Sequence, residues 1–259
     1  EVHEAVGRLR LATGDAAEAA ASYRKALALG PQSPDVLIGL AFALAADGKA
    51  EEAERMHQQA IAAQPRYAYA HIAYGNSLFG EGRVADAIVA YERATILAPD
   101  NPNAFNNLGT AYMFTGDFDR ASRALERSIA IEPRRGSYSG YGSVQYYRGH
   151  YKSAEEMLRK ALELAPADHR IWGNLADALR FDARPEEARQ AYRKALELAD
   201  GELAVNPKHA VNQAQAAYYA IQLGEADRAR RGIALALPEG DGSNYVHYYV
   251  ALAELGLGN

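Results

Sequence analysis

Residues 102–134 read PNAFNNLGTAYMFTGDFDRASRALERSIAIEPR, and variants of this stretch recur along the whole chain. A glycine, Gly116, separates two halves of helical periodicity, and Pro133 closes the stretch. The glycine position returns about every 34 residues, a period typical of stacked helical repeats. The successive marker residues are Gly14, Gly48, Gly82, Gly116, Gly149, Ala183, Gly224 and Gly258. Such self-similarity predicts a solenoid whose units bury their hydrophobic faces only against their neighbours.

Small side chains occupy fixed positions in each unit. In the first half they are Gly7, Ala41, Gly75, Gly109, Gly142, Ala176, Ala217 and Ala251. A second small residue follows twelve positions later, from Ala19 to Ala229. This spacing lets two antiparallel helices approach closely. Between the helices, the marker glycine suits a left-handed C-terminal cap. A proline, which cannot continue a helix, ends the second half of five units. These prolines are Pro31, Pro65, Pro99, Pro133 and Pro166.

The first half of the quoted stretch carries a recognisable motif. Phe105, Leu108, Gly109 and Tyr112 match a large residue, Leu-Gly and Tyr at set spacings, and the unit that contains Trp172 matches closely. With this motif the chain resembles the tetratricopeptide repeat (TPR) family over almost its whole length. The resemblance implies an all-α fold, a right-handed α-solenoid (superhelix) of about seven and a half TPR-like helix-turn-helix repeats.

We expect a single TPR solenoid domain over residues 1–259. Its repeats are expected at 1–33, 34–67, 68–101, 102–134, 135–168, 169–209 and 210–243, with a half-repeat at 244–259 that caps the stack. The sixth repeat is seven residues longer than a regular one, and its proline is delayed to Pro207. Seven residues add about two helical turns, or ~10 Å, without rotating the buried face. Because Leu196, Ala199 and Leu203 continue the apolar stripe, we expect an extended helix there.

The composition excludes several classes of function. The net charge is −5, with acidic and basic residues interleaved, so the chain lacks the basic footprint of a nucleic-acid-binding protein. It has no cysteine, which excludes disulfides and thiolate metal sites. No apolar run approaches the roughly 18 residues that span a bilayer. We expect a cytoplasmic location, with the periplasm as the alternative. Because the chain starts at Glu1 rather than Met, we expect it to be a piece of a longer protein.

In the family, the first helices line the concave face of the superhelix, so the repeat register assigns the groove-facing residues. The third and fourth repeats contribute Tyr69, Ile72, Asn76, Phe79, Asn103, Asn106, Asn107, Thr110, Met113 and Phe114. The later repeats contribute Ser139, Gly140, Ser143, Tyr146, Tyr147, Arg170, Asn174, Asp177, Arg180, Phe181, Gln215 and Tyr218. Amides can pair with an extended backbone, and aromatic side chains supply contact area at low entropy cost. The alternative is an ordinary solvated helix face.

Three details of the register lead to further expectations. Gly136 and Gly140 should face the groove, where they predict a socket for one bulky partner side chain; the alternative is drift at an unconstrained position. Asp177 and Arg180 are one helical turn apart, which predicts a surface ion pair. His57 replaces the usual aromatic residue of the second helix, so we expect it in the core rather than on a metal.

The leading function is a protein–protein interaction module, a scaffold that binds a peptide or partner segment in its groove. The alternative is a regulatory or sensory arm of a larger signalling enzyme or transcription regulator. The family's clamp for chaperone C-termini fits poorly, because Ile72 stands where that clamp has a lysine. The family's asparagine ladder is matched only in part, by Asn107, Asn174 and the substitute Gln215. No catalytic motif occurs, so we expect no enzyme activity, no cofactor and no metal.

Overall fold

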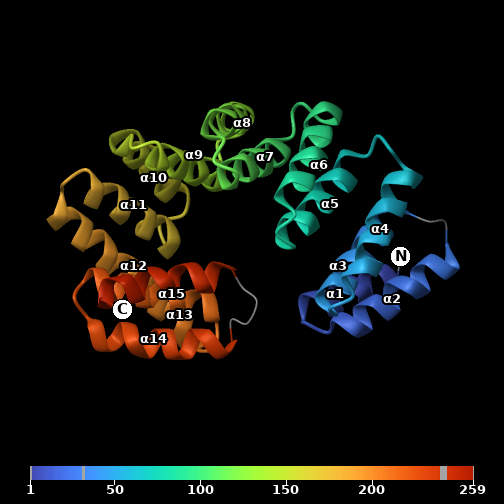
Figure 1. The fold of residues 1–259 in the computed structure, drawn as a ribbon. Coiled ribbons are helices and arrows are strands. Elements are labelled where there is room, and N and C mark those ends of the chain that lie inside the picture. The colour runs from blue at the N-terminus through green and yellow to red at the C-terminus, as the bar shows by residue number, and fades with distance from the viewer. Residues whose placement is uncertain (1, 31–32, 240–243, 259) are drawn as a thin grey trace. The chain divides into compact units, whose positions relative to one another are not determined.

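The computed structural model describes residues 2–30, 33–239 and 244–258. Within these ranges it holds fifteen α-helices and no strand, which confirms the all-α prediction (Figure 1). The described residues exclude Glu1, Pro31 and residues 240–243. The repeat boundary that we expected after residue 243 therefore lies at the edge of an undescribed segment. The chain forms two compact units, Glu1–Glu132 and Pro133–Asn259, here called the N-terminal and C-terminal units.

The N-terminal unit contains four helix pairs. Their bounds are α1 Val2–Ala12, α2 Ala16–Leu29, α3 Pro34–Ala46, α4 Ala50–Ala63, α5 Ala68–Gly80, α6 Val84–Leu97, α7 Pro102–Phe114 and α8 Phe118–Ile131. Each odd-numbered helix packs against the even-numbered helix that follows it, and α1, α3, α5 and α7 contact one another in order. The predicted stacking of helix-turn-helix repeats is therefore confirmed within this unit.

The C-terminal unit continues the pattern with three pairs and a final helix. Their bounds are α9 Arg135–Tyr147, α10 Tyr151–Leu164, α11 His169–Phe181, α12 Pro185–Val205, α13 Ala210–Gln222, α14 Ala226–Glu239 and α15 Asn244–Leu257. The last helix packs mainly on α13 and also on α14, as the first half of a further repeat would.

The marker glycines end the first helices in a left-handed backbone conformation. Gly14, Gly48, Gly82, Gly116, Gly149, Gly224 and Gly258 have φ between 75° and 87°. Residues other than glycine rarely adopt this backbone conformation, because their Cβ atom comes too close to the following carbonyl oxygen. Ala183, at the same point of the sixth repeat, is forced to φ 58°. The predicted caps are confirmed, and one of them is made by a residue unsuited to it.

The small-residue sites lie where two helices of a repeat meet. A Cβ atom on Gly142 would lie 2.8 Å from Cγ of Leu158 on α10, and one on Gly75 would lie 2.6 Å from Cε1 of Tyr91 on α6. Each second helix thus presses a bulky side chain onto the backbone of its partner, as the sequence register predicts. The residue four positions before that bulky side chain, such as Ala154, is also fully buried.

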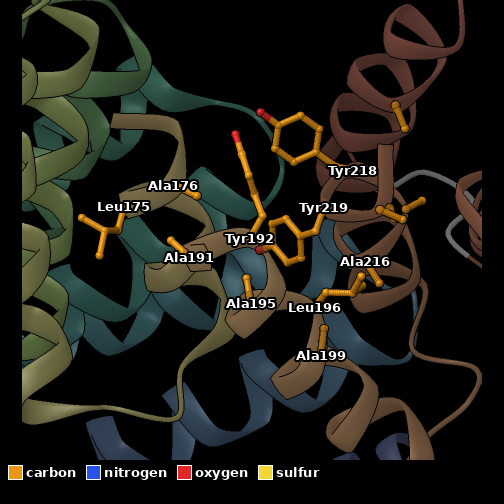
Figure 2. Packing of buried hydrophobic residues seen from close by; sticks show 14 of the residues in the cluster. Leu175, Ala176, Ala191, Tyr192, Ala195, Leu196, Ala199, Ala216, Tyr218 and Tyr219 are labelled. Atoms are coloured by element: carbon orange, nitrogen blue, oxygen red, sulfur yellow. The ribbon is translucent and has the colours of Figure 1, made fainter. Parts of the chain in front are cut away.

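Helix α12 is 21 residues long and exceeds every other described helix, which confirms the predicted extension. Its apolar stripe reaches Leu196 and Ala199, which are buried with Tyr192 and Tyr219 in the core of the C-terminal unit (Figure 2). Leu203 packs at the edge of the same cluster. In the N-terminal unit, His57 is fully buried between Phe42 and Tyr74, so its predicted place in the core is confirmed.

Candidate functional site

In the N-terminal unit, side chains on α5, α6 and α7 form a chain of hydrogen bonds. Oδ1 of Asn76 accepts a hydrogen bond of 2.8 Å from the Tyr91 hydroxyl and one of 2.9 Å from Nδ2 of Asn107. Nδ2 of Asn106 in turn donates to Oδ1 of Asn107 over 3.4 Å. Oδ1 of Asn106 is buried and has no hydrogen-bond partner among the described residues. The predicted groove amides of two successive repeats are therefore in contact.

A cavity of about 370 Å³ opens beside this amide chain. Its lining consists of Asn76, Phe79, Gly80, Tyr91, Asn106, Asn107 and Thr110. The ring of Phe79 meets that of Phe114 edge to face, with 5.0 Å between the ring centroids. Five of the seven lining residues are ones that the sequence register placed on the groove face.

Other predicted groove residues of this unit lie elsewhere. Ile72 is 5% exposed and packs in a core cluster with Ala94 and Ala104, so its expected groove position is wrong. Ile72 lies against Ala94 on the second helix of its own repeat and against Ala104 on the first helix of the next repeat. Tyr69 is exposed and lines a separate cavity of about 430 Å³ with residues of α1–α3. Asn103 is exposed and Met113 is half-buried, away from both linings.

The C-terminal unit contains a smaller cavity of about 180 Å³. It lies among α9, α10, α11, α13 and α15. Its lining consists of Ser143, Tyr146, Tyr147, Leu158, Asn174, Asp177, Arg180, Phe181, Tyr218, Tyr248, Tyr249 and Leu252. Eight of these twelve residues were predicted from the register. Neither Gly136 nor Gly140 is among the described lining residues, so the socket inferred from these glycines stays a prediction.

Asp177 is the acidic residue of this cavity. Its Oδ1 accepts hydrogen bonds of 2.5 Å from the hydroxyls of both Tyr192 and Tyr218. Burial raises the pKa of the carboxyl, while the two phenolic hydrogen bonds oppose that shift. The surface ion pair that we expected with Arg180 is wrong, because the helix turns Asp177 inwards to the tyrosines while Arg180 stays exposed.

The guanidinium of Arg180 lies over the ring of Phe181, 4.6 Å from its centroid. That ring also meets Tyr146 edge to face, with 5.5 Å between centroids. Burial raises the pKa of Tyr146 and Tyr218 well above the usual phenol value, and that of Tyr249 to about 12. The phenols therefore stay protonated at neutral pH, and any negative charge in the cavity comes from Asp177.

The remaining predicted residues of the C-terminal unit take other roles. Arg170 forms an ion pair with Asp168, the N-cap of its own helix, at 2.9 Å. The carbonyl of Ser139 accepts a hydrogen bond from the Ser143 hydroxyl at 3.0 Å. Gln215 is only 3% exposed, so it lies beneath the surface rather than on it, and its Oε1 has no hydrogen-bond partner within the described part of the chain.

The described residues contain no group of three or more His, Asp or Glu side chains that could hold a metal ion. No described helix combines the length and the apolar character needed to cross a bilayer.

Four family models match successive parts of the chain, and each describes the tetratricopeptide or TPR repeat. They match residues 10–76, 75–116, 102–135 and 142–202. The chain belongs to the tetratricopeptide repeat family.

A segment of 103 residues is 28% identical to human Tetratricopeptide repeat protein 7B. It covers 39% of this chain and 12% of that protein, so the chain spans a small part of this TPR relative.

Solved structures share the fold at low sequence identity. A tetratricopeptide repeat protein from Parabacteroides merdae superposes with a TM-score of 0.72 at 15% identity, over 97% of each chain. A chain of the APC/C hetero-tetramer Cut9-Hcn1 gives a TM-score of 0.69 at 18% identity, over 97% of this chain and 47% of that one. PilW, a type IV pilus biogenesis factor, gives 0.65 at 16% identity, over 85% of this chain and 99% of its own. TPR solenoids present extended binding surfaces to other proteins, and this chain has that scaffold.

The TPR register also explains which cavity residues the sequence analysis missed. Tyr248, Tyr249 and Leu252 come from α15, which we had treated only as a cap. Counting from the small residue Ala251, Leu252 stands where Asp177 and Tyr218 stand in the two preceding repeats. Extending the register by one half-repeat would have placed all three residues on the groove face.

Proposed function

We propose that the face formed by the first helices binds an extended segment of a partner protein. The observation that carries this proposal is that the same register positions line an open cavity in each compact unit. In the N-terminal unit Asn76 and Asn107 border one cavity, and in the C-terminal unit Asn174 and Asp177 border the other. An ordinary solvated helix face would not require amides and aromatic rings to line a cavity in both units.

The chemistry of the two cavities suits a polypeptide. Asparagine amides provide donors and acceptors for a backbone, while Phe79 and the tyrosines provide apolar area for side chains. The hetero-tetramer that contains Cut9 supports this reading, because a protein of the same fold there assembles with another protein.

A random-peptide display selection against the whole chain tests the proposal. We expect enriched peptides that bind the wild type, and Asn107→Ala should weaken them by about 1–3 kcal/mol, because the truncation removes an amide from the cavity wall. Gln58→Ala on α4 truncates an exposed amide outside both cavities and is the matched control. Equal binding by both variants, with unchanged unfolding midpoints, would place recognition on another surface.

A further inference from the structure

The cavity of the C-terminal unit contains a carboxylate, that of Asp177, which forms no ion pair among the described residues. Oδ1 of Asp177 accepts both phenolic hydrogen bonds, whereas Oδ2 receives no hydrogen bond and no ion pair there. Oδ2 is not fully buried, and Asp177 lines the cavity, so this oxygen is accessible to a ligand there. Burial raises the pKa of this carboxyl and so disfavours its charged form, which the two phenolic hydrogen bonds offset in part. A cation next to Oδ2 would stabilise the charged form further by pairing with it.

Aromatic rings surround this carboxylate. Five tyrosines and Phe181 line the cavity, and neighbouring rings contact one another. The centroids of Tyr248 and Tyr249 are 5.1 Å apart, and those of Tyr218 and Tyr249 are 5.9 Å apart. A cation is attracted to the faces of such rings, and the attraction grows when the site excludes water. Rings and carboxylate thus favour the same sign of ligand charge.

Arg180 does not supply the missing cation. Its guanidinium is stacked on Phe181, on the exposed side of α11, and it forms no ion pair with Asp177. Arg180 nevertheless lines the same cavity, and without an ion pair its charge opposes the rise that burial causes in the pKa of the Asp177 carboxyl, so it offsets part of the attraction for a second cation.

Resting on the proposed function, we propose that this cavity binds the side chain of a lysine in the partner segment. The ammonium pairs with Oδ2 of Asp177, and the methylene stem packs against the tyrosine rings. Lysine fits better than arginine because its ammonium is a compact point charge that can pair with one oxygen, whereas a guanidinium pairs best with both oxygens of a carboxylate, and Oδ1 of Asp177 already accepts two phenolic hydrogen bonds.

Titration of the whole chain with small probes, followed by NMR, tests this inference. The probes are N-acetyl-lysine methylamide and its uncharged analogue N-acetyl-norleucine methylamide. We expect the lysine probe to shift the resonances of the cavity residues saturably, with the norleucine probe at least tenfold weaker. Equal affinity of the two probes, or no saturable shift at the cavity, would overturn the inference without any variant.

Two variants that each remove one negative charge test whether Asp177 binds the lysine ammonium. Asp177→Asn retains an oxygen that can accept both phenolic hydrogen bonds, and it should reduce lysine-probe binding at least tenfold. Asp227→Asn removes the same charge from an exposed position on α14 and should leave binding unchanged. Unchanged binding by Asp177→Asn, or equal losses in both variants, would overturn the inference.

The peptides selected in the display experiment distinguish a failure of the proposed function from a failure of the lysine site. If they bind the first-helix face but contain no preferred lysine and tolerate Asp177→Asn, the proposed function holds and the lysine site is wrong. If the lysine probe binds as expected but the selection yields no peptide, the proposed function fails while the cation site stands.

Discussion

Tyr218 on α13 donates a hydrogen bond of 2.5 Å to Oδ1 of Asp177 on α11, so one side-chain contact joins the first helices of two successive repeats. The two residues are 41 positions apart, and Tyr192 on α12 donates to the same oxygen. The three side chains therefore connect three helices of the C-terminal unit at one half-buried point.

Tyr218→Phe should lower the free energy of unfolding by about 1.5–3 kcal/mol, the usual cost of losing a hydrogen bond to a charged group. A urea denaturation curve measures it. Tyr69→Phe removes an exposed hydroxyl that makes no hydrogen bond among the described residues and should change stability little. Equal effects of the two changes would mean that the contact with Asp177 contributes nothing.

Ala121→Leu should destabilise the N-terminal unit by about 1–3 kcal/mol, because overpacking displaces neighbouring groups. Ala121 is fully buried, and its carbonyl oxygen would lie 3.2 Å from a Cβ atom on Gly109. Ala130→Leu places the same side chain on the exposed face of the same helix and serves as the control. If chemical denaturation gave both variants the midpoint of the wild type, our repeat register would be wrong.

His57 should make stability depend on pH in the acidic range. Burial lowers the pKa of the folded-state imidazole from 6.5 to about 4. The unfolded chain therefore takes up a proton first, so the stabilisation is complete above pH 6.5 and falls as the pH drops towards 4. The total loss is on the order of 3 kcal/mol.

A comparison with His57→Leu isolates this effect. Leucine occupies the equivalent position in two other repeats, and neither ring nitrogen of His57 has a hydrogen-bond partner in the part of the chain that the structure describes. The variant should match or exceed the wild type at pH 7, and its advantage should widen as the pH falls to 4. Parallel stability curves for the two proteins would contradict the assignment.

The fold could be predicted from the sequence because the same pattern of packing residues recurs in each repeat. A glycine such as Gly75 and its opposing Tyr91 are separated by a fixed spacing, and that spacing determines which helix faces meet. The extension of α12 was predictable for the same reason, since Leu196 and Ala199 keep the stripe in phase. Local periodicity therefore sufficed for the elements and their pairing.

The site was only partly predictable, because the repeat register predicts the helix face on which a residue lies but not how deeply its side chain is buried. Asp177 and Arg180 share one helix face, yet the first turns inwards to tyrosines from two later helices while the second stays exposed. Gln215 and Ile72 were likewise expected on the surface and are buried. Their burial depends on the neighbouring repeat, which a single repeat's pattern does not reveal.

The cap at Ala183 leads to the last prediction. Its φ of 58° is left-handed, whereas the other seven marker positions have glycine. The conformation costs an L-residue about 1–2 kcal/mol, part of which is recovered because alanine restricts the unfolded chain more than glycine does.

Ala183→Gly should therefore raise the free energy of unfolding by about 0.5–1 kcal/mol. The reciprocal change, Gly116→Ala, should lower it by a similar amount, because φ is +78° there and a Cβ atom would meet nothing within 4 Å. With no steric contact involved, backbone strain alone decides the sign. Thermal and urea unfolding of both variants measure the pair, and shifts in the same direction would show that this strain does not control the cap.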